Sequence, residues 1–154
     1  DFGAWRDLQR HRVGLQMRAR PTSKLGYSIP EELEHPSLAV ALEHYRRGMD
    51  RTAEFHARLF RERPFDADYV AALGHHCAWT CAMDLRQWAY LVELRSGASG
   101  HTSYRRIAHQ MARLVMPHVP NLAPYLRVDW TGETDRRAAE ERTQEKLAKA
   151  RKEA

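Results

Sequence analysis

The stretch from Asp84 to Arg106, DLRQWAYLVELRSGASGHTSYRR, most constrains how this chain can fold. Asp84 is a suitable N-cap, and Gln87, three residues later, forms a capping-box-like pair with it. Apolar residues then recur with helical spacing and predict a broad packing stripe, made by Leu85, Trp88, Ala89, Leu91 and Val92. We expect this helix to end near Leu94 and a second helix to start after the small-residue turn.

Two arginines mark the ends of this predicted helix. Arg86 lies in the first turn, where the helix dipole and the exposed N–H groups favour anions, so a cation there contributes nothing to helix stability. Its position therefore favours a phosphate ligand. Arg95 follows nine residues later, about 180° around the helix at ~100° per residue, and Ser96-Gly97 would let it turn into a site. The alternative, two solvated surface arginines, stays open on this stretch alone.

Length and composition describe a soluble domain with its own core. The chain has 154 residues, of which 43% are hydrophobic and 29% charged. No apolar run approaches the ~20 residues that span a bilayer, and no signal peptide is visible. Cys77 and Cys81 are too few and too close for a disulfide framework, so we expect a reducing, cytoplasmic compartment. The chain opens with Asp1-Phe2-Gly3 instead of Met, so we expect a processed or trimmed product that starts inside a fold.

Arginine clusters near the N-terminus. The net charge is +5, and 21 arginines stand against four lysines. Codon use in a GC-rich genome accounts for the global ratio, but the local clustering needs its own explanation. From Arg6 to Arg20, five arginines and one histidine accompany one acid, Asp7. This density is self-repulsive unless an anion is usually present, and guanidinium groups suit phosphates.

A long helix is predicted from Ser37, as N-cap, to the residue before Pro64. Its packing side alternates spacings of four and three residues and comprises Leu38, Leu42, Tyr45, Met49, Thr52, His56 and Phe60. We interpret this face as core and His56 as a core or rim histidine with satisfied hydrogen bonds. Residues 66–73 form a short amphipathic piece that Gly74 stops.

The stretch from His75 to Met83, HHCAWTCAM, fits either a buried strand or a helical lead-in. Its two histidines and two cysteines invite comparison with zinc sites. Neither a second cysteine pair nor an H-E-x-x-H motif is present, so we expect no metal. Beyond the central stretch, a helix carries Ile107, Ala108, Met111, Leu114 and Val115, and Pro117 and Pro120 end it.

The C-terminal stretch is composed mainly of charged residues and alanine. Residues 134–154 contain seven basic and five acidic side chains, with Leu147 as the single large apolar residue. This composition has high helix propensity but cannot form a core. We therefore expect one domain over residues 1–133 and a charged helical tail over 134–154.

The order of these motifs resembles the flavin-dependent thymidylate synthases, the ThyX family. Arg10-His11-Arg12 is similar to the start of that family's motif R-H-R-x-x-S-x-N-E-x-S-x-R-Y. Asp84-x-Arg86 resembles its downstream N-x-R, and Glu93-Leu94-Arg95-Ser96 resembles the helix end that follows nine residues after that arginine. The run Trp5 to Arg12 and the loop Leu25 to Glu32 add to the similarity, which covers residues 1 to about 130.

The resemblance implies an α/β (α+β) fold with helices packed on a twisted sheet, assembled as a homotetramer with FAD at subunit interfaces. It implies that Arg10, His11, Arg12 and Arg86 contact FAD and that Arg10 and Arg95 contact dUMP. Arg95 would be catalytic, because it favours ionisation of the uracil N3. The implied reaction is methyl transfer to dUMP from methylenetetrahydrofolate by way of reduced flavin, with NADPH as reductant. We expect guanidinium groups far apart in the chain to meet around these phosphates.

Several positions depart from the family motif. The polar motif residues after Arg12 are replaced by Leu15, Met17, Arg18, Arg20 and Thr22-Ser23. Asp84 and Tyr90 replace asparagines, and Asp68 replaces a nucleotide-binding arginine, which would repel a nearby phosphate by roughly a few kcal/mol. The alternative is therefore a catalytically degenerate domain that acts as a structural or nucleotide-binding partner.

A nucleic-acid-binding module is a third hypothesis, based on the Arg6–Arg20 cluster and the basic tail. No helix-turn-helix signature, zinc finger or aromatic RNA platform accompanies these charges. We therefore do not expect nucleic acid or a membrane as partner.

Overall fold

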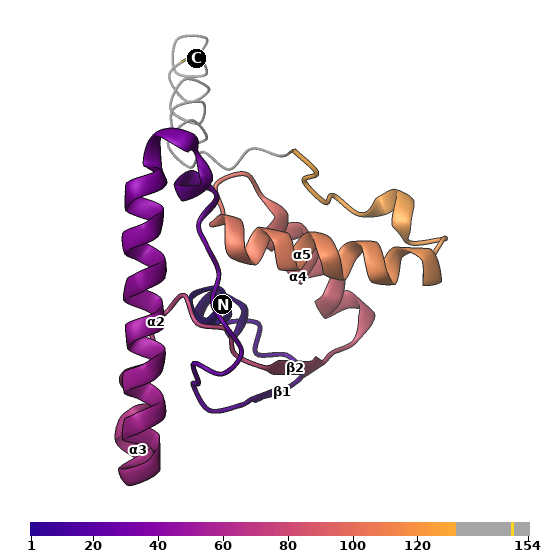
Figure 1. Ribbon diagram of the computed structural model, residues 1–154. Helices are drawn as coiled ribbons and strands as arrows, with labels where there is room; N and C mark the ends of the chain where they lie inside the picture. Colours follow the sequence, from indigo (N-terminus) through magenta and orange to yellow (C-terminus); the bar gives the residue numbers. More distant parts are fainter. Residues whose placement is uncertain (132–148, 150–154) are drawn as a thin grey trace. The chain divides into compact units, whose positions relative to one another are not determined.

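The computed structural model describes residues 1–131 and Lys149, and its architecture is the α+β class expected from the sequence (Figure 1). It divides into two compact units. The first contains Asp1–Arg10 and Leu15–Ala82, and the second contains His11–Gly14 and the chain from Met83 onward. Of the charged tail predicted over residues 134–154, all but Lys149 lies outside the described residues. Within the described residues, no helix is long and apolar enough to cross a membrane.

The first unit begins with a short helix, α1 (Phe2–Leu8), whose N-cap Asp1 accepts a hydrogen bond from the Ala4 amide at 2.6 Å. It continues with β1 (Leu15–Arg18), η1 (Glu31–Glu34), η2 (Pro36–Leu38), α2 (Ala39–Glu62), α3 (Pro64–Ala67) and β2 (Trp79–Ala82). Because α1 ends at Leu8, the Arg10-His11-Arg12 segment follows the helix instead of belonging to it.

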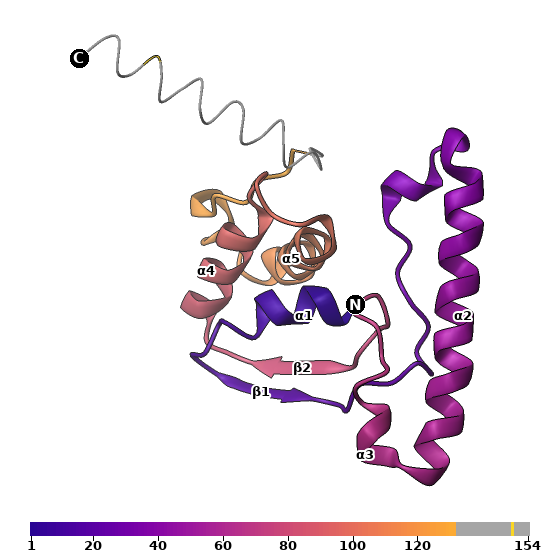
Figure 2. The ribbon, with the colours of Figure 1, turned by 90° about the vertical axis from the view of Figure 1, so that its left-hand side faces the viewer.

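The sheet of this unit consists of β1 and β2, which run antiparallel with Leu15 opposite Ala82 and Arg18 opposite Trp79 (Figure 2). The stretch that was ambiguous in the sequence, residues 75–83, therefore supplies a strand. Strand β1 was not predicted, because its four residues, LQMR, give only a short alternation. Leu15 and Met17 share one face of β1 and are 64% and 60% exposed.

The long helix α2 is capped differently from the prediction. The ring Nδ1 of His35 accepts the Ser37 amide at 3.3 Å, so His35 caps a short η2 turn and Ser37 is not the N-cap. The predicted packing side is buried at its centre, where Met49 and His56 lie, and exposed at its two ends. The helix ends at Glu62, before Pro64, as predicted.

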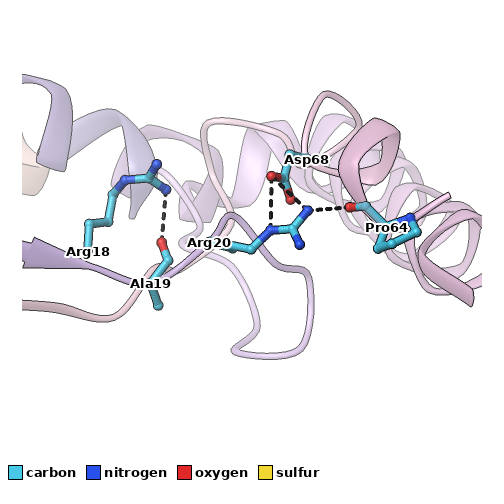
Figure 3. A network of polar contacts seen from close by, with 5 residues as sticks. All are labelled: Arg18, Ala19, Arg20, Pro64 and Asp68. Carbon is cyan, nitrogen blue, oxygen red and sulfur yellow. Dashed lines mark hydrogen bonds and ion pairs between the residues drawn. The ribbon is translucent and has the colours of Figure 1, made fainter.

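Two arginines of the N-terminal cluster, Arg18 and Arg20, are held by contacts within the first unit, and Figure 3 shows their hydrogen bonds. Arg20 donates through Nε and Nη2 to Asp68 Oδ2, both at 3.1 Å, and through Nη2 to the Pro64 carbonyl. Its Cζ lies 4.7 Å from the centre of the Phe65 ring. Arg18 stacks on Trp5 at 4.5 Å. An external anion is therefore not required to offset the charge of Arg20.

The second unit consists of α4 (Leu85–Ser96) and α5 (Thr102–Val115), which pack side by side, followed by η3 (Met116–His118) and η4 (Ala123–Tyr125) (Figure 2). Among its described residues, the buried apolar ones are Trp88, Leu91, Val92, Ala108 and Ala112. Leu85, which we assigned to the packing stripe, and Leu114, one of the apolar residues of the following helix, are 42% and 72% exposed. Both lie at helix ends, where less neighbouring chain is available to cover them.

Candidate anion-binding site at His11 and Arg95

The predicted site residues fall in both units. Arg10 belongs to the first unit, where it is exposed and forms an ion pair with Asp7 at 3.7 Å. The other four, His11, Arg12, Arg86 and Arg95, belong to the second unit. The site is therefore described from the second unit alone.

The second unit brings His11 and Arg95 into direct contact, although 84 residues separate them in the chain. Arg95 Nε donates a hydrogen bond to His11 Nε2 at 3.0 Å, and His11 is only 3% exposed. Arg95 lies inside the last turn of α4, because the helix ends at Ser96 and Gly97 is its C-cap. The helix therefore continues two residues beyond the predicted end near Leu94. The Arg95 side chain reaches His11 from a regular helical backbone.

Gln87 holds the other side of the His11 ring. Its backbone amide donates to Asp84 Oδ1 at 2.7 Å, as a capped helix requires. Its side-chain amide does not complete the expected capping box but lies 3.2 Å from His11 Nδ1. Because His11 Nε2 accepts from Arg95, the neutral ring carries its proton on Nδ1. The Gln87 atom 3.2 Å from Nδ1 is the side-chain nitrogen, which is also a donor, so the neutral ring requires the Gln87 amide to be turned over with its oxygen as the acceptor.

The environment of His11 favours its neutral form. Burial lowers the pKa of His11, and the nearby Arg95 charge lowers the pKa further. A neutral ring can accept a hydrogen bond from a guanidinium, whereas an imidazolium cannot. The hydrogen bond from Arg95 to His11 therefore forms only while the His11 ring is neutral.

Helix geometry explains which α4 residues share this site. Gln87 precedes Arg95 by eight residues, which places the two about 80° apart around the helix at ~100° per residue. Arg86 precedes it by nine residues and lies on the opposite side of α4, in the exposed first turn. Arg12 is also exposed. Within one copy of the second unit, His11 and Arg95 are therefore in contact, whereas Arg86 lies on the opposite side of α4.

Two tyrosines flank the His11–Arg95 pair. The Tyr90 ring is tilted by 59° against His11 with 5.6 Å between ring centres, and Tyr90 is 56% exposed. The Tyr104 ring lies beneath the Arg95 guanidinium at 5.3 Å. In the sequence Tyr90 was recognised as a departure, but neither Gln87 nor Tyr104 was predicted to be a neighbour of the site. The eight-residue spacing could have indicated Gln87, while nothing local indicates Tyr104.

A buried arginine fixes the end of α4 behind the site. Arg105, 3% exposed, donates through Nε to the Ser96 carbonyl and through Nη2 to the Thr131 carbonyl, both at 2.8 Å. The Asp129 amide donates to Ser96 Oγ at 2.9 Å. The last turn of α4, which carries Arg95, is therefore tied to α5 and to the closing segment of the unit.

The Asp129 carboxylate is part of this anchor. Burial raises its pKa, but the Thr131 hydroxyl and amide, the Ala98 amide and the Arg105 charge outweigh burial and hold the pKa below its ordinary value. Asp129 is therefore ionised at neutral pH and complements Arg105. This anchor was not predicted, because the sequence alone does not distinguish a buried arginine from a solvated one.

The histidine and cysteine cluster that invited a zinc comparison has another use. His75 Nδ1 accepts the Ala72 amide at 3.0 Å, and burial raises the pKa of both Cys77 and Cys81. Across the described residues, no group of three or more histidine, cysteine or acidic side chains is placed to hold a metal ion.

A family model described as thymidylate synthase complementing protein matches residues 1–121, a range that includes His11 and Arg95. The chain belongs to the thymidylate synthase complementing protein family. The match covers both units, so membership extends beyond the R-H-R segment.

Curated relatives of this family member carry the name UPF0159 protein. One from Chlamydia muridarum is 38% identical over 135 residues, which are 88% of this chain and 25% of the relative. One from Chlamydia pneumoniae is 35% identical over 120 residues, 78% of this chain and 22% of the relative. One from Thermoplasma acidophilum is 30% identical over 136 residues, 86% of this chain and 26% of the relative. The chain spans about a quarter of the length of these relatives.

Proposed function

We propose that this protein acts in flavin-dependent thymidylate synthesis, with methyl transfer to dUMP from methylenetetrahydrofolate and with NADPH as reductant. The observation that carries the proposal is the 3.0 Å hydrogen bond from Arg95 to His11. It joins the histidine of the R-H-R segment to the arginine at the downstream helix end, which are two of the places where the family resemblance implies ligand contacts.

The donor chemistry fits FAD and a nucleotide. Arg12 and Arg86 are exposed guanidinium groups, and His11 and Gln87 are neutral polar groups beside Arg95. Guanidinium groups bind phosphate oxygens bidentately, and FAD and dUMP together bring three phosphates. In this assignment Arg10, His11, Arg12 and Arg86 hold FAD, while Arg10 and Arg95 hold dUMP. FAD would supply the reducing equivalents.

Arg95 is the proposed catalytic residue. A guanidinium against the uracil edge stabilises the negative charge that develops as the N3 proton is lost. Neutral His11 accepts from Arg95 Nε and so orients the guanidinium without adding a second positive charge. No cysteine nucleophile takes part in this proposal, in keeping with burial that raises the pKa of the Cys77 and Cys81 thiols.

The opposite placement of Arg86 and Arg95 on α4 supports a shared site between copies. If both contact one flavin and its nucleotide, the two arginines come from different chains. We therefore propose a homo-oligomer, a tetramer by the family resemblance, that works in the cytoplasm.

The test is flavin uptake by the purified protein. We expect flavin absorbance bands, saturable FAD binding and dUMP binding, with R95Q weakening dUMP binding by at least about tenfold. R61Q, which changes an exposed arginine on α2, is the matched control and should bind normally. A colourless protein that takes up no FAD on titration would exclude the proposal.

A second candidate is a catalytically degenerate member that binds nucleotides or supports a partner. Its basis is the set of motif positions after Arg12. Leu15 and Met17 are exposed apolar residues on β1, and the guanidinium of Arg20 is bound by Asp68. Formation of dTMP from dUMP, methylenetetrahydrofolate and NADPH would eliminate this candidate, and nucleotide binding without turnover would support it.

A further inference from the structure

We propose that Tyr104 is a positioning residue that holds the Arg95 guanidinium in the orientation in which it binds an anionic nucleotide. The ligand part of this inference rests on the proposed function of Arg95. The positional part, from the Tyr104 ring to the guanidinium, stands on the geometry of the second unit alone. The two parts can therefore fail separately.

Arg95 is constrained from two directions. His11 accepts from Nε at 3.0 Å and fixes one edge of the guanidinium. The Tyr104 ring centre lies 5.3 Å from Arg95 Cζ, within the range at which an aromatic ring attracts a cation. A hydrogen bond at Nε does not by itself prevent the planar group from rocking about that contact. The ring of Tyr104 lies against the guanidinium and limits this motion.

Gly100 leaves the space that the Tyr104 ring occupies. A Cβ atom at position 100 would lie 2.7 Å from Tyr104 Cε2 and 3.0 Å from Arg105 Cγ, which is closer than side chains pack. Glycine at this position therefore lets the ring lie against the turn that connects α4 to α5. The turn between α4 and α5 and the first turns of α5 therefore pack together and carry the Tyr104 ring.

Arg105, the next residue, anchors that support to the helix that carries Arg95. Its Nε donates to the Ser96 carbonyl at 2.8 Å, one residue beyond Arg95. Tyr104 and Arg95 are thus connected through the backbone by a buried charge-assisted hydrogen bond. The helical turn that carries Tyr104 is therefore fixed relative to the last turn of α4, which carries Arg95.

The expected benefit is preorganisation. An arginine side chain loses much rotamer freedom when it binds a ligand, and a side chain that is already ordered loses less. Replacing the ring by an aliphatic side chain should therefore weaken nucleotide binding by about 3- to 10-fold. A change that removes only the hydroxyl should have little effect, because the contact is through the ring face.

The experiment compares Y104L, Y104F and the control Y125L in the purified protein. Tyr125 lies in the same unit and is 78% exposed. Nuclear magnetic resonance would follow the Arg95 Nε–H proton, identified by its loss in R95K. In the wild type and in Y104F and Y125L we expect a protected Nε–H signal, and in Y104L we expect faster exchange of that proton with solvent. G100A displaces the ring without removing it and should reproduce the effect of Y104L.

The second readout is affinity for dUMP, measured by calorimetry in the same variants. Y104L and G100A should bind about 3- to 10-fold more weakly than wild type, with Y104F keeping wild-type affinity. Unchanged Nε–H exchange in Y104L would overturn the inference, as would loss of protection in Y104F, because then the hydroxyl and not the ring would position Arg95. If no variant, including wild type, binds dUMP, the proposed function fails and the exchange data still decide the role of Tyr104.

Discussion

His11 has two neighbours that depend on its protonation state. Arg95 Nε donates to its Nε2 at 3.0 Å, and the Gln87 amide lies 3.2 Å from its Nδ1. Protonation would remove the acceptor and place two cations side by side, which costs free energy in a buried site. The hydrogen bond that Arg95 donates therefore depends on pH, because it is lost when His11 is protonated.

The sign of this pH dependence follows from the pKa of His11. Burial and Arg95 lower the folded-state pKa below the ordinary 6.5, so the unfolded chain binds the proton first as the pH falls. The free energy of unfolding should therefore decrease from about pH 6.5 down to the folded-state pKa and level off below it, with a slope of at most about 1.4 kcal/mol per pH unit for one proton.

Urea unfolding of wild type, H11Q and the exposed-site control H118Q between about pH 7.5 and about pH 5 would test this effect. Glutamine keeps an acceptor oxygen but does not titrate, so H11Q should lose this part of the decline. His75, whose pKa burial also lowers, remains in all three proteins and sets a common background. Equal declines in H11Q and wild type would contradict the assignment.

At the scale of elements, two glycines in the first unit should respond to alanine in opposite directions. Gly48 lies inside α2, and a Cβ atom added there would meet no neighbouring atom within 4 Å. A Cβ atom added at Gly74 would lie 2.7 Å from Tyr45 Oη, which donates to the Ser28 carbonyl at 2.8 Å. The glycine that ends the predicted amphipathic piece is thus required by close packing.

We expect G48A to stabilise the protein by about 0.5–1 kcal/mol, because alanine favours the helix. We expect G74A to destabilise it by about 1–3 kcal/mol, because the ring of Tyr45 must move. Urea or thermal unfolding measures both, and each variant is the other's control. A stabilising G74A would show that the contact with Tyr45 is absent in solution.

The clasp between Arg20 and Asp68 joins the segment after β1 to α3 and its following turn. It combines two hydrogen bonds to one carboxylate oxygen with the face of Phe65. The side chains of Arg20 and Asp68 are 44% and 27% exposed, so solvent screens part of the attraction.

Replacing Asp68 by asparagine should reduce the free energy of unfolding by about 0.5–1.5 kcal/mol, since the fork of Arg20 loses its charged acceptor. The matched control is D66N. Asp66 pairs with Arg63 at 3.5 Å, and their side chains are 57% and 73% exposed, so its loss should cost less than about 0.5 kcal/mol. Chemical unfolding compares the two, and equal effects would rule out a special role for the clasp.

At the scale of the whole molecule, the chain spans about a quarter of the length of its UPF0159 relatives. Arg86 and Arg95 face opposite sides of α4, since nine helical residues turn through about 180°. Under the proposed function, we expect a flavin site that uses both arginines to combine two copies of α4.

This geometry predicts complementation between variants. R86Q and R95Q should each weaken FAD or dUMP binding when present alone. Subunits of the two variants mixed in one oligomer should recover part of the binding, because some sites then combine an intact Arg86 with an intact Arg95 from another copy. Binding is measured by flavin absorbance and calorimetry on co-expressed protein. No recovery in a verified mixed oligomer would place both arginines in separate sites.

Local patterns in the sequence determined several features of this protein. The Asp84 cap, the helix that starts at Leu85 and the end of α2 before Pro64 depend on neighbours a few residues away. The family resemblance came from the order of the R-H-R segment and the later arginines. Helix caps and the amphipathic spacing of a helix involve residues only a few positions apart, so they can be recognised in the sequence itself.

Tertiary structure alone decided the rest. The pairing of β1 with β2, the partners of Arg20, the burial of Arg105 and the meeting of His11 with Arg95 all join residues from 26 to 84 positions apart. An arginine has the same letter whether it faces water, a carboxylate, a carbonyl or a ring. Which of these it contacts depends on how distant segments pack, and packing free energy belongs to the folded chain as a whole.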